Sequence, residues 1–316
     1  MRFDCLIIGD IVLDVFFGMG SKSSFVRGGT SYCEKASICW GGSGNVAAAL
    51  SHLGAKTCFI GKSGCDLWGI TYKRELQTRG VVTRIFFDKA RSTGLSLITV
   101  GERGERSFHV FRGANDELSA EEIDKSIDLI KSSRYLYFSG YSLVRVPQRD
   151  AILHAVNLAK ENGLSLVFDP GAHNLILSNV KLFRYLQEIC DVFCLNLDEA
   201  KAIAGTRRIK IALNELRERG KITALKCGSG GSFLITRDRV IKTPAYKVRC
   251  IDSTGAGDAF VAGIVYGLIN HLTLESAAKL ANWFAAQVTT GIGARNFPLM
   301  KKAPSHIRQK FPQSQS

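Results

Sequence analysis

Several patterns that mark common protein classes are missing from this sequence. It contains no run of about 18 apolar residues, the length that a membrane-spanning helix needs. Its start, Met1 to Cys5, lacks the apolar run of a signal peptide. Its nine cysteines show no C-x-x-C pair and no zinc-like spacing. We therefore expect a soluble, cytoplasmic protein without a structural zinc site, in which most thiols are buried as small apolar groups.

The common nucleotide-binding signatures are absent as well. No G-x-x-x-x-G-K-[ST] occurs, which argues against a P-loop NTPase, and the protein-kinase signatures H-R-D and D-F-G are missing. A partial match to G-x-G-x-x-G occurs at Gly255-Ala256-Gly257, but Phe260 occupies the place of the third glycine. A Rossmann dehydrogenase is therefore disfavoured.

The chain carries a formal net charge of +14, yet the charge is spread along it. Short basic runs such as Arg207-Arg208 and Lys301-Lys302 do not form an arm, and no aromatic-interleaved RNA motif accompanies them. We expect a solvated basic surface that attracts small anionic molecules, and no nucleic-acid partner.

Apolar runs alternate with amphipathic segments along most of the chain, which predicts an α/β fold with a mainly parallel sheet and helices on both faces. The predicted strands are Phe3–Gly9, Lys56–Lys62, Tyr135–Ser139, Ser165–Phe168, Val192–Leu195 and Ala224–Cys227. The predicted helices are Asn45–Leu53, Leu67–Arg79, Ala120–Lys131, Arg149–Asn162, Leu197–Ala204, Ile209–Arg219 and Asp258–Asn270.

Two regions break this alternation, Val15–Ile38 and Gly94–Phe111. In the second, Leu95–Val100 and Ser107–Phe111 flank a Gly-Glu-Arg-Gly turn at 101–104, which predicts a hairpin. These segments are β structure that lies apart from the main alternation.

The segment from Asp252 to Asp258 reads Asp-Ser-Thr-Gly-Ala-Gly-Asp and leads into an apolar helix. The N–H groups of a helix's first turn lack intrahelical acceptors and, with the helix dipole, bind anions. Gly255 and Gly257 would let the backbone approach a phosphate closely. Because a carboxylate repels phosphate, we interpret Asp258 as a base that takes a proton from a hydroxyl. The alternative is an ordinary capping aspartate.

A second motif, Gly41-Gly42-Ser43-Gly44-Asn45, leads into the apolar residues 46–50. With both motifs in this order, the chain resembles the PfkB/ribokinase family of carbohydrate kinases over nearly its whole length. In that family a D-T-x-G-A-G-D motif carries the base and an anion hole, which assigns these roles to Asp258 and to Gly255, Ala256 and Gly257.

The resemblance implies a ribokinase-like α/β fold with a small β-sheet lid over the sugar. The main domain is then expected to comprise residues 1–14, 39–93 and 112–312, and the lid residues 15–38 and 94–111. In the family such a lid often supplies a dimer contact, so a homodimer through the lid is expected. Residues 313–316 are expected to be a frayed tail.

Polar residues near the predicted strand ends provide a substrate side for the site. Asp10 and Asp14 follow the first strand, where the ends of parallel strands gather ligand groups. Carboxylates accept hydrogen bonds from sugar hydroxyls, and the Asn45 amide both donates and accepts. The predicted substrate-binding residues are Asp10, Asp14, Gly41, Gly42, Asn45 and Asn115, several of them assigned by the resemblance. The alternatives are capping for the aspartates and a tight turn for the glycines.

A second set of residues belongs to the nucleotide side. Asn196 and Glu199 match the family's N-x-x-E motif and lie about one turn apart, which suits Mg²⁺ held by Glu199 through water. The same letters also form an ordinary capping box. The resemblance further implies that Lys226, Gly228 and Gly230 lie beside the ATP phosphates and ribose, and Asn282 near the adenine; for Lys226 the alternative is a surface lysine.

The family's C-terminal loop, often associated with a monovalent cation, corresponds to Gly291-Ile292-Gly293-Ala294. The basic residue expected before the glycine–alanine pair is missing, which argues against dependence on such a cation. Taken together, the motifs predict an ATP- and Mg²⁺-dependent kinase that phosphorylates a hydroxyl of a sugar. A nucleoside is the alternative acceptor. A catalytically idle sugar- or nucleotide-binding regulator is the alternative of another class, although such a protein has no need for a base.

Overall fold

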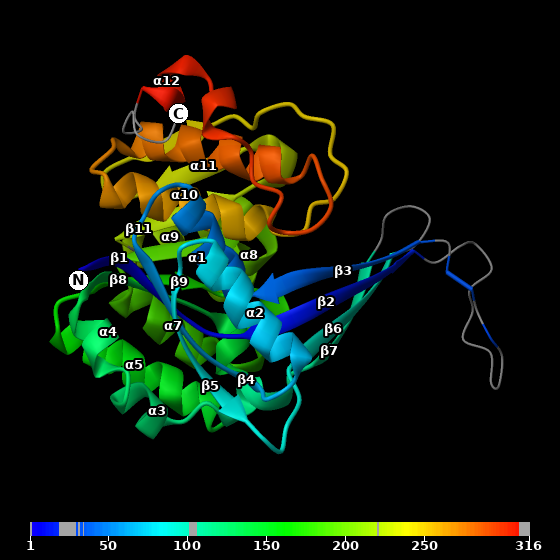
Figure 1. Cartoon of the computed structure of the whole chain (residues 1–316). Helices are drawn as coiled ribbons and strands as arrows, with labels where there is room; N and C mark the ends of the chain where they lie inside the picture. The colour runs from blue at the N-terminus through cyan, green and yellow to red at the C-terminus, as the bar shows by residue number, and fades with distance from the viewer. Residues whose placement is uncertain are drawn as a thin grey trace.

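The computed structural model describes residues 2–18, 30, 32–33, 35–100, 106–219 and 221–309. Its largest feature is a nine-stranded sheet in the order β13-β12-β11-β10-β9-β8-β1-β4-β5 (Figure 1). All neighbouring strands are parallel except the pairs β11–β12 and β12–β13. The strands are β1 (Phe3–Ile8), β4 (Thr57–Gly64), β5 (Val82–Asp88), β8 (Ser133–Ser139), β9 (Ser165–Asp169), β10 (Val192–Asn196), β11 (Ile222–Lys226), β12 (Ser232–Ile235) and β13 (Val240–Thr243).

Helices pack on both faces of this sheet. One face is covered by α1 (Gly44–His52), α2 (Leu67–Thr78), α10 (Ala256–Ile269), α11 (Leu274–Val288) and α12 (Ser305–Arg308). The other is covered by α3 (Ala120–Asp124), α4 (Ile127–Lys131), α5 (Gln148–Glu161), α6 (His173–Ser178), α7 (Val180–Ile189), α8 (Leu197–Ala204) and α9 (Ile209–Arg219). Short 3-10 helices are η1 (Gly113–Glu117), η2 (Gly140–Leu143), η3 (Gly228–Gly230) and η4 (Met300–Lys302).

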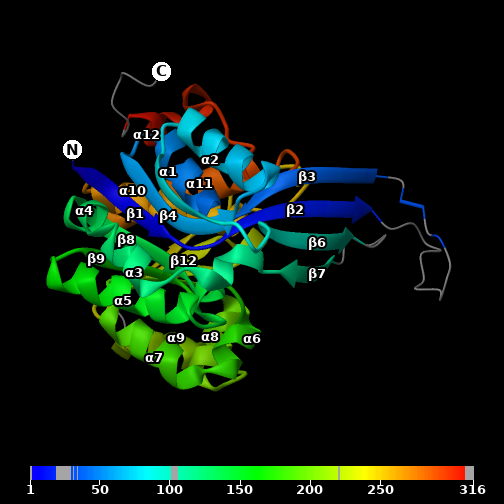
Figure 2. The same ribbon diagram turned by 60° about the horizontal axis from the view of Figure 1, so that its bottom comes forward.

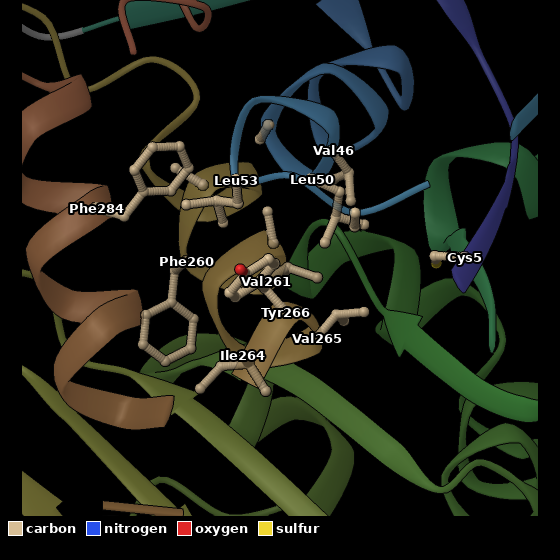
Figure 3. Packing of buried hydrophobic residues seen from close by; sticks show 14 of the residues in the cluster. Cys5, Val46, Leu50, Leu53, Phe260, Val261, Ile264, Val265, Tyr266 and Phe284 are labelled. Atoms are coloured by element: carbon tan, nitrogen blue, oxygen red, sulfur yellow. The ribbon is translucent and has the colours of Figure 1, made fainter. Parts of the chain in front are cut away.

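Two apolar cores result, one on each face of the sheet. Strand β1 serves both, because Cys5 and Ile7 belong to one core while Leu6 and Ile8 belong to the other. A central parallel strand is buried on both sides and therefore reads as a continuous apolar run. Figure 3 shows the first core, where side chains of α10 pack against those of α1 and against Phe284 of α11. This packing fixes the start of α10, which carries the end of the motif Asp252–Asp258.

A separate four-stranded sheet projects from the main body (Figure 2). Its order is β3-β2-β6-β7, formed by β2 (Ile11–Gly18), β3 (Lys35–Gly42), β6 (Gly94–Val100) and β7 (Arg106–Phe111). Strands β6 and β7 pair antiparallel, which confirms the predicted hairpin. Because β2 begins at Ile11 and β3 ends at Gly42, this small sheet includes residues 11–14 and 39–42, which we had placed in the main domain.

The alternation of segments predicted most of the large sheet, with some errors. The predicted helix Ala120–Lys131 is two helices, α3 and α4, separated at Lys125 and Ser126. Strands β5, β12 and β13 and helices α6, α7, α11 and α12 were not predicted. The turn at 101–104, the tail at 313–316 and residues 19–29, 31 and 34 of the predicted lid lie outside the described residues.

None of the helices in the described ranges is long and apolar enough to cross a membrane. Four of the nine cysteines, Cys5, Cys58, Cys190 and Cys194, are buried. The prediction that most thiols would be buried was therefore wrong. Cys33, Cys65 and Cys250 are exposed because they lie in surface loops rather than in the sheet or in a core-facing helix.

Candidate active site

The site lies where the carboxyl ends of the parallel strands meet, which is where open α/β sheets bind ligands. Asp10 follows β1 by two residues, and Asp169, Asn196 and Lys226 are the last residues of β9, β10 and β11. The start of α10 lies at the same edge, since Asp258 influences the pKa of both Tyr137 and Tyr141 at the end of β8 and in η2. Residues far apart in the sequence therefore share one charged region.

Helix α10 begins with Gly255 as its N-cap, in the left-handed conformation with φ of 77°. A Cβ there would lie 2.4 Å from Cα of Ala294, so both the conformation and the close contact require glycine. Ala256 donates its N–H to Ser253 O at 3.3 Å. A Cβ at Gly257 would lie 3.7 Å from the Lys226 ammonium. The first turn of α10 therefore faces a cation, as a seat for phosphate would.

Asp258 stands in this first turn and is partly exposed. Its Oδ2 accepts a hydrogen bond from Nδ2 of Asn45 at 3.1 Å. Burial raises the pKa of Asp258 to about 6, with a further rise from Asp169 and opposing effects from the Asn45 hydrogen bond and Lys226. A carboxylate with this pKa can accept a proton near neutral pH. Among the described residues its side chain accepts no hydrogen bond from the backbone of α10, so it does not cap its own helix.

Asn45 is itself held by a residue that the sequence analysis missed. Arg295, in the loop after α11, donates Nε to Oδ1 of Asn45 at 2.9 Å. The same arginine forms an ion pair with Glu75 of α2. We had noted that no basic residue precedes the Gly293-Ala294 pair; this one follows it directly. A single arginine in a loop gives no periodic signal, so the sequence alone could not find it.

Asp10 is surrounded by donors that the sequence analysis also missed. Arg112, just after β7, approaches it with Nη1 at 3.0 Å from Oδ2 and Nη2 at 3.2 Å from Oδ1. Oδ1 also accepts from Ser142 at 3.1 Å and from Gln148 at 2.7 Å. Asp10 is thus fixed in place, and Oδ2, with one donor from the protein, has acceptor capacity left for a ligand hydroxyl.

Asp14 lies on β2 with Gly41 of β3 beside it. A Cβ at Gly41 would lie 2.3 Å from Oδ2 of Asp14, so only glycine leaves room for this carboxyl. Gly42 has φ of 72°, and a Cβ there would lie 2.3 Å from O of Asp10. Burial, followed by the charge of Asp258, raises the pKa of Asp14 to about 7. The two glycines therefore allow the two acidic residues to approach the same place.

Asn115 holds the backbone at the start of β2. Its Oδ1 accepts from Ile11 N at 2.7 Å, and its Nδ2 donates to Ile11 O at 2.9 Å and to Arg112 O at 2.8 Å. These bonds use both amide hydrogens, so only one lone pair of its oxygen is left for a ligand. Its contacts favour a role in positioning Asp10 and Asp14 over direct binding.

Lys226 lies between two carboxylates on the nucleotide side. It pairs with Asp169 at 2.6 Å, and the charges of Asp169 and Glu199 hold its pKa above the ordinary value despite burial. Glu199 accepts from Asn196 at both oxygens, at 2.8 and 2.7 Å, and Oδ1 of Asn196 accepts from the Glu199 N–H. The capping box is therefore formed. Burial raises the pKa of Glu199 to about 7, which Lys226 opposes.

Three further predicted residues lie around this region. Gly228 and Gly230 form the exposed turn after β11, and Gly228 has φ of 55° with nothing within 4 Å of a Cβ. Asn282 of α11 is buried and donates to Thr243 O and Pro244 O, both at 3.0 Å. Asn282 thus fixes the segment after β13.

The donor set suits a magnesium ion that is bound mainly through water and phosphate. Within the described residues no group of three or more His, Cys, Asp or Glu side chains gathers as a metal cage. Mg²⁺ in nucleotide sites needs only one or two carboxylates, and Glu199 and Asp169 flank Lys226 at the strand ends. Glu199 has one lone pair left on each oxygen, so the residues fit a water-mediated Mg²⁺.

The loop for which a monovalent cation was considered is tied to the motif Asp252–Asp258. Asp252 accepts from Gly293 N at 2.8 Å through Oδ2, and from Thr254 N at 2.9 Å through Oδ1. The loop is thus held by hydrogen bonds of the protein itself. Dependence on a monovalent cation stays an open prediction.

Comparison with known sequences places these residues in a family. Residues 4–302 match the sequence profile of pfkB family carbohydrate kinases. The chain is 28% identical to fructokinase-1 of Oryza sativa subsp. japonica over 268 residues, 80% of this chain and 83% of the rice protein. It is 30% identical to a fructokinase of Solanum tuberosum over 244 residues, 76% of this chain and 75% of the potato protein.

Solved structures agree with this result. A probable sugar kinase from Rhizobium etli CFN 42 superimposes with a TM-score of 0.86 at 26% identity, covering 93% of this chain and 95% of that one. Adenosine kinase from Sinorhizobium meliloti superimposes with a TM-score of 0.84 at 26% identity and covers 98% of both chains. The similarity therefore extends over both sheets and the site between them.

Proposed function

Because this chain belongs to the PfkB family of carbohydrate kinases, it is an ATP-dependent kinase of a sugar or nucleoside, and we propose that Asp258 is its base. The observation that carries the proposal is the Asp258 carboxyl, held by Asn45 at the start of α10 with a pKa near 6. It takes the proton of the acceptor hydroxyl as that oxygen attacks the γ-phosphorus of ATP. The γ-phosphoryl group moves to the hydroxyl oxygen, and ADP leaves.

The charge on the transferring phosphoryl group is stabilised by groups around the start of α10. The amides of Gly255, Ala256 and Gly257 contribute through the helix N-terminus. The ammonium of Lys226, close to Gly257, adds a positive charge at the same place. Because these groups are fixed before the reaction, they need no reorganisation as charge develops.

The nucleotide is held by the ends of β10 and β11 and by the segment after β13. Gly228 and Gly230 lie beside the phosphates and ribose, Asn196 orients Glu199, and Asn282 shapes the adenine side. Glu199 holds Mg²⁺ through water. When bound, Mg²⁺ would supply positive charge that neutralises the phosphates of ATP.

A sugar is the acceptor that we propose, bound by Asp10, Asp14, Asn45 and the Gly41-Gly42 turn. The fructokinase relatives favour a sugar, since several of them match over about three quarters of this chain. The adenosine kinase structure, which covers 98% of the chain, makes a nucleoside the second candidate.

The small sheet acts as a lid over the acceptor and excludes water from the reaction. Its β7 strand exposes Phe108, Val110 and Phe111 at 60%, 53% and 55%. Exposed apolar side chains on one sheet suit contact with a second copy of the chain, so we propose a homodimer through the lid, in the cytoplasm, where ATP is available.

A coupled assay of ADP formation tests the function. Purified protein with ATP and Mg²⁺ is mixed with a panel of ketohexoses, aldopentoses and nucleosides, with Asp258→Asn as the blank for each. We expect Asp258-dependent ADP formation with one or a few sugars. Activity with nucleosides alone would replace the sugar by the second candidate, and ADP formation equal in both proteins would exclude the proposed base.

A further inference from the structure

Arg295 is a buried cation that the reaction above does not use. Its side chain is 5% exposed, and its guanidinium lies 5.0 Å from the ring centroid of Tyr72. Nη1 pairs with Glu75, and Nε donates to Oδ1 of Asn45. Asn45 in turn donates to Asp258. A chain of contacts therefore runs from α2 through the loop after α11 and through α1 to α10.

This series of contacts determines which way the side-chain amide of Asn45 is oriented. An amide turned by 180° exchanges its oxygen and nitrogen, so its orientation is set by its partners. A guanidinium only donates, and it therefore requires Oδ1 of Asn45 on its own side. Nδ2 must then face Asp258. In the opposite orientation, Oδ1 would face the carboxylate of Asp258 and both hydrogen bonds would be lost.

The simpler interpretation is that Arg295 only forms a structural ion pair with Glu75. Arg79 allows the two interpretations to be separated, because it also pairs with Glu75 and lies over the ring of Phe297 at 5.4 Å. No hydrogen bond joins Arg79 to Asn45 in the described part of the chain. Substitution of either arginine would therefore disturb an ion pair with Glu75. Only substitution of Arg295 would also disturb a hydrogen bond to Asn45.

We infer that Arg295 is a positioning residue, which locks the Asn45 amide so that its N–H always faces the Asp258 carboxylate. The inference rests on the proposed function, because it requires Asp258 to be the base. Glu75 compensates the charge of Arg295, and Arg295 acts on the reaction only through Asn45.

Several groups around Asp258 titrate or carry charge. They are Asp14 of β2, Tyr137 of β8, Tyr141 of η2, Asp169 of β9 and Lys226 of β11. Burial raises the pKa of Asp258, and the Asn45 hydrogen bond opposes this rise. Freeing the amide removes that opposition, so the pKa of Asp258 rises further and the base is protonated up to a higher pH. The acid side of the pH–rate profile then moves upward.

Arg295→Lys is the main test, since it keeps the charge but loses the planar fork that reaches Asn45 and Glu75 together. We expect the acid limb of kcat/KM to rise by about one pH unit, the equivalent of one hydrogen bond to a charged group. In the range below that limb kcat should fall about tenfold, with the KM for ATP unchanged. Arg79→Lys is the matched control and should leave the profile in place.

The titration of other groups does not account for a shift of the acid limb. The protonation of ATP is common to all variants. Asp14, whose pKa Arg295 lowers, still has a cation beside it in the lysine variant. Thermal melts show whether each variant folds. If Arg295→Lys did not fold, Glu75→Gln would replace it, with a smaller upward shift expected than for the lysine, and still none for Arg79→Lys.

A double variant tests whether Arg295 acts through Asn45. In an Asn45→Ala background, Arg295→Lys should cause no further shift of the acid limb, because the amide that it orients is gone. A shift of equal size in both backgrounds, or equal shifts for Arg295→Lys and Arg79→Lys, would overturn the inference while leaving the function intact. Full activity of Asp258→Asn would instead exclude Asp258 as the base, on which the inference rests.

Discussion

The substrate side around Asp10 and the phosphate side around Asp258 hold their carboxylates in opposite ways. Asp10 accepts from four donor groups, two of them on the guanidinium of Arg112. Among the described residues Asp258 forms no ion pair, and its one side-chain hydrogen bond comes from a neutral amide, that of Asn45. Both are carboxyl groups in the same region of the protein, yet only one of them lies against a permanent positive charge.

The difference separates binding from proton transfer. A carboxylate held by an arginine is fixed in its orientation, which suits a residue that must hold a hydroxyl in one place. A carboxylate buried without a cation has a raised pKa and accepts a proton readily. Arg295 refines this contrast, because its charge is turned toward Glu75 and reaches Asp258 only through an amide.

The largest effect is expected from Asp258→Asn, which removes the base and keeps the shape of the side chain. Phosphorylation should fall by about 10²–10⁴-fold, the usual contribution of a general base. ATP binding, measured by calorimetry, should stay close to that of the wild type. A fall in ATP affinity as large as the fall in rate would mean that residue 258 acts in binding, as Asp10 does.

Asp14→Asn tests the electrostatics on the border between the two regions. In the unfolded chain Asp14 loses its proton near pH 4, but in the folded protein only near pH 7. The contribution of Asp14 to the free energy of unfolding is therefore largest at low pH, and it decreases as the pH rises from about 4 to 7. Urea unfolding at pH 4.5 and pH 8 should show a drop that is smaller in Asp14→Asn, by up to about 3 kcal/mol. An identical drop in both proteins would contradict the raised pKa.

Asp10→Asn should damage stability more than chemistry. It leaves Arg112, which is 12% exposed, with Asp116 as its remaining carboxylate partner, at a cost of about 1–3 kcal/mol in the free energy of unfolding. The KM for the acceptor should rise more than kcat falls. Asp150→Asn is the control, because its ion pair with Arg149 is exposed and should cost less than about 1 kcal/mol. Equal melting curves for the two variants would show that the Arg112 pair adds nothing.

Much of the fold could be predicted because buried parallel strands are continuous apolar runs, and β1, β8, β9 and β10 were found in this way. The edge strands β5 and β13 have exposed positions and weaker patterns, and β12 has only four residues, so all three were missed. The predicted helix at 120–131 failed at Ser126, because apolar periodicity continued across a residue at which the chain begins a new helix.

The parts of the candidate site that form short contiguous sequence motifs, Gly41–Asn45 and Asp252–Asp258, were predicted. The residues that position the side chains of the site through hydrogen bonds were missed. Arg112, Gln148 and Arg295 are single polar residues far from their partners in the sequence, and 250 positions separate Arg295 from Asn45. These residues meet their partners only when the folded chain brings the strand ends together. A local sequence pattern therefore cannot predict these contacts.

The smallest effect is expected from alanine substitutions at two glycines with similar backbone conformations, which together test the phosphate side. Gly228 and Gly163 have φ of 55° and 74°, and a Cβ at either would meet nothing within 4 Å. Alanine at each should therefore cost only the strain of the left-handed conformation, about 1–2 kcal/mol. Only Gly228→Ala should also raise the KM for ATP, because Gly163 lies after α5, away from the strand ends. If both variants had the KM of the wild type, the turn after β11 would have no part in nucleotide binding, and the phosphate side would reduce to Lys226 and the start of α10.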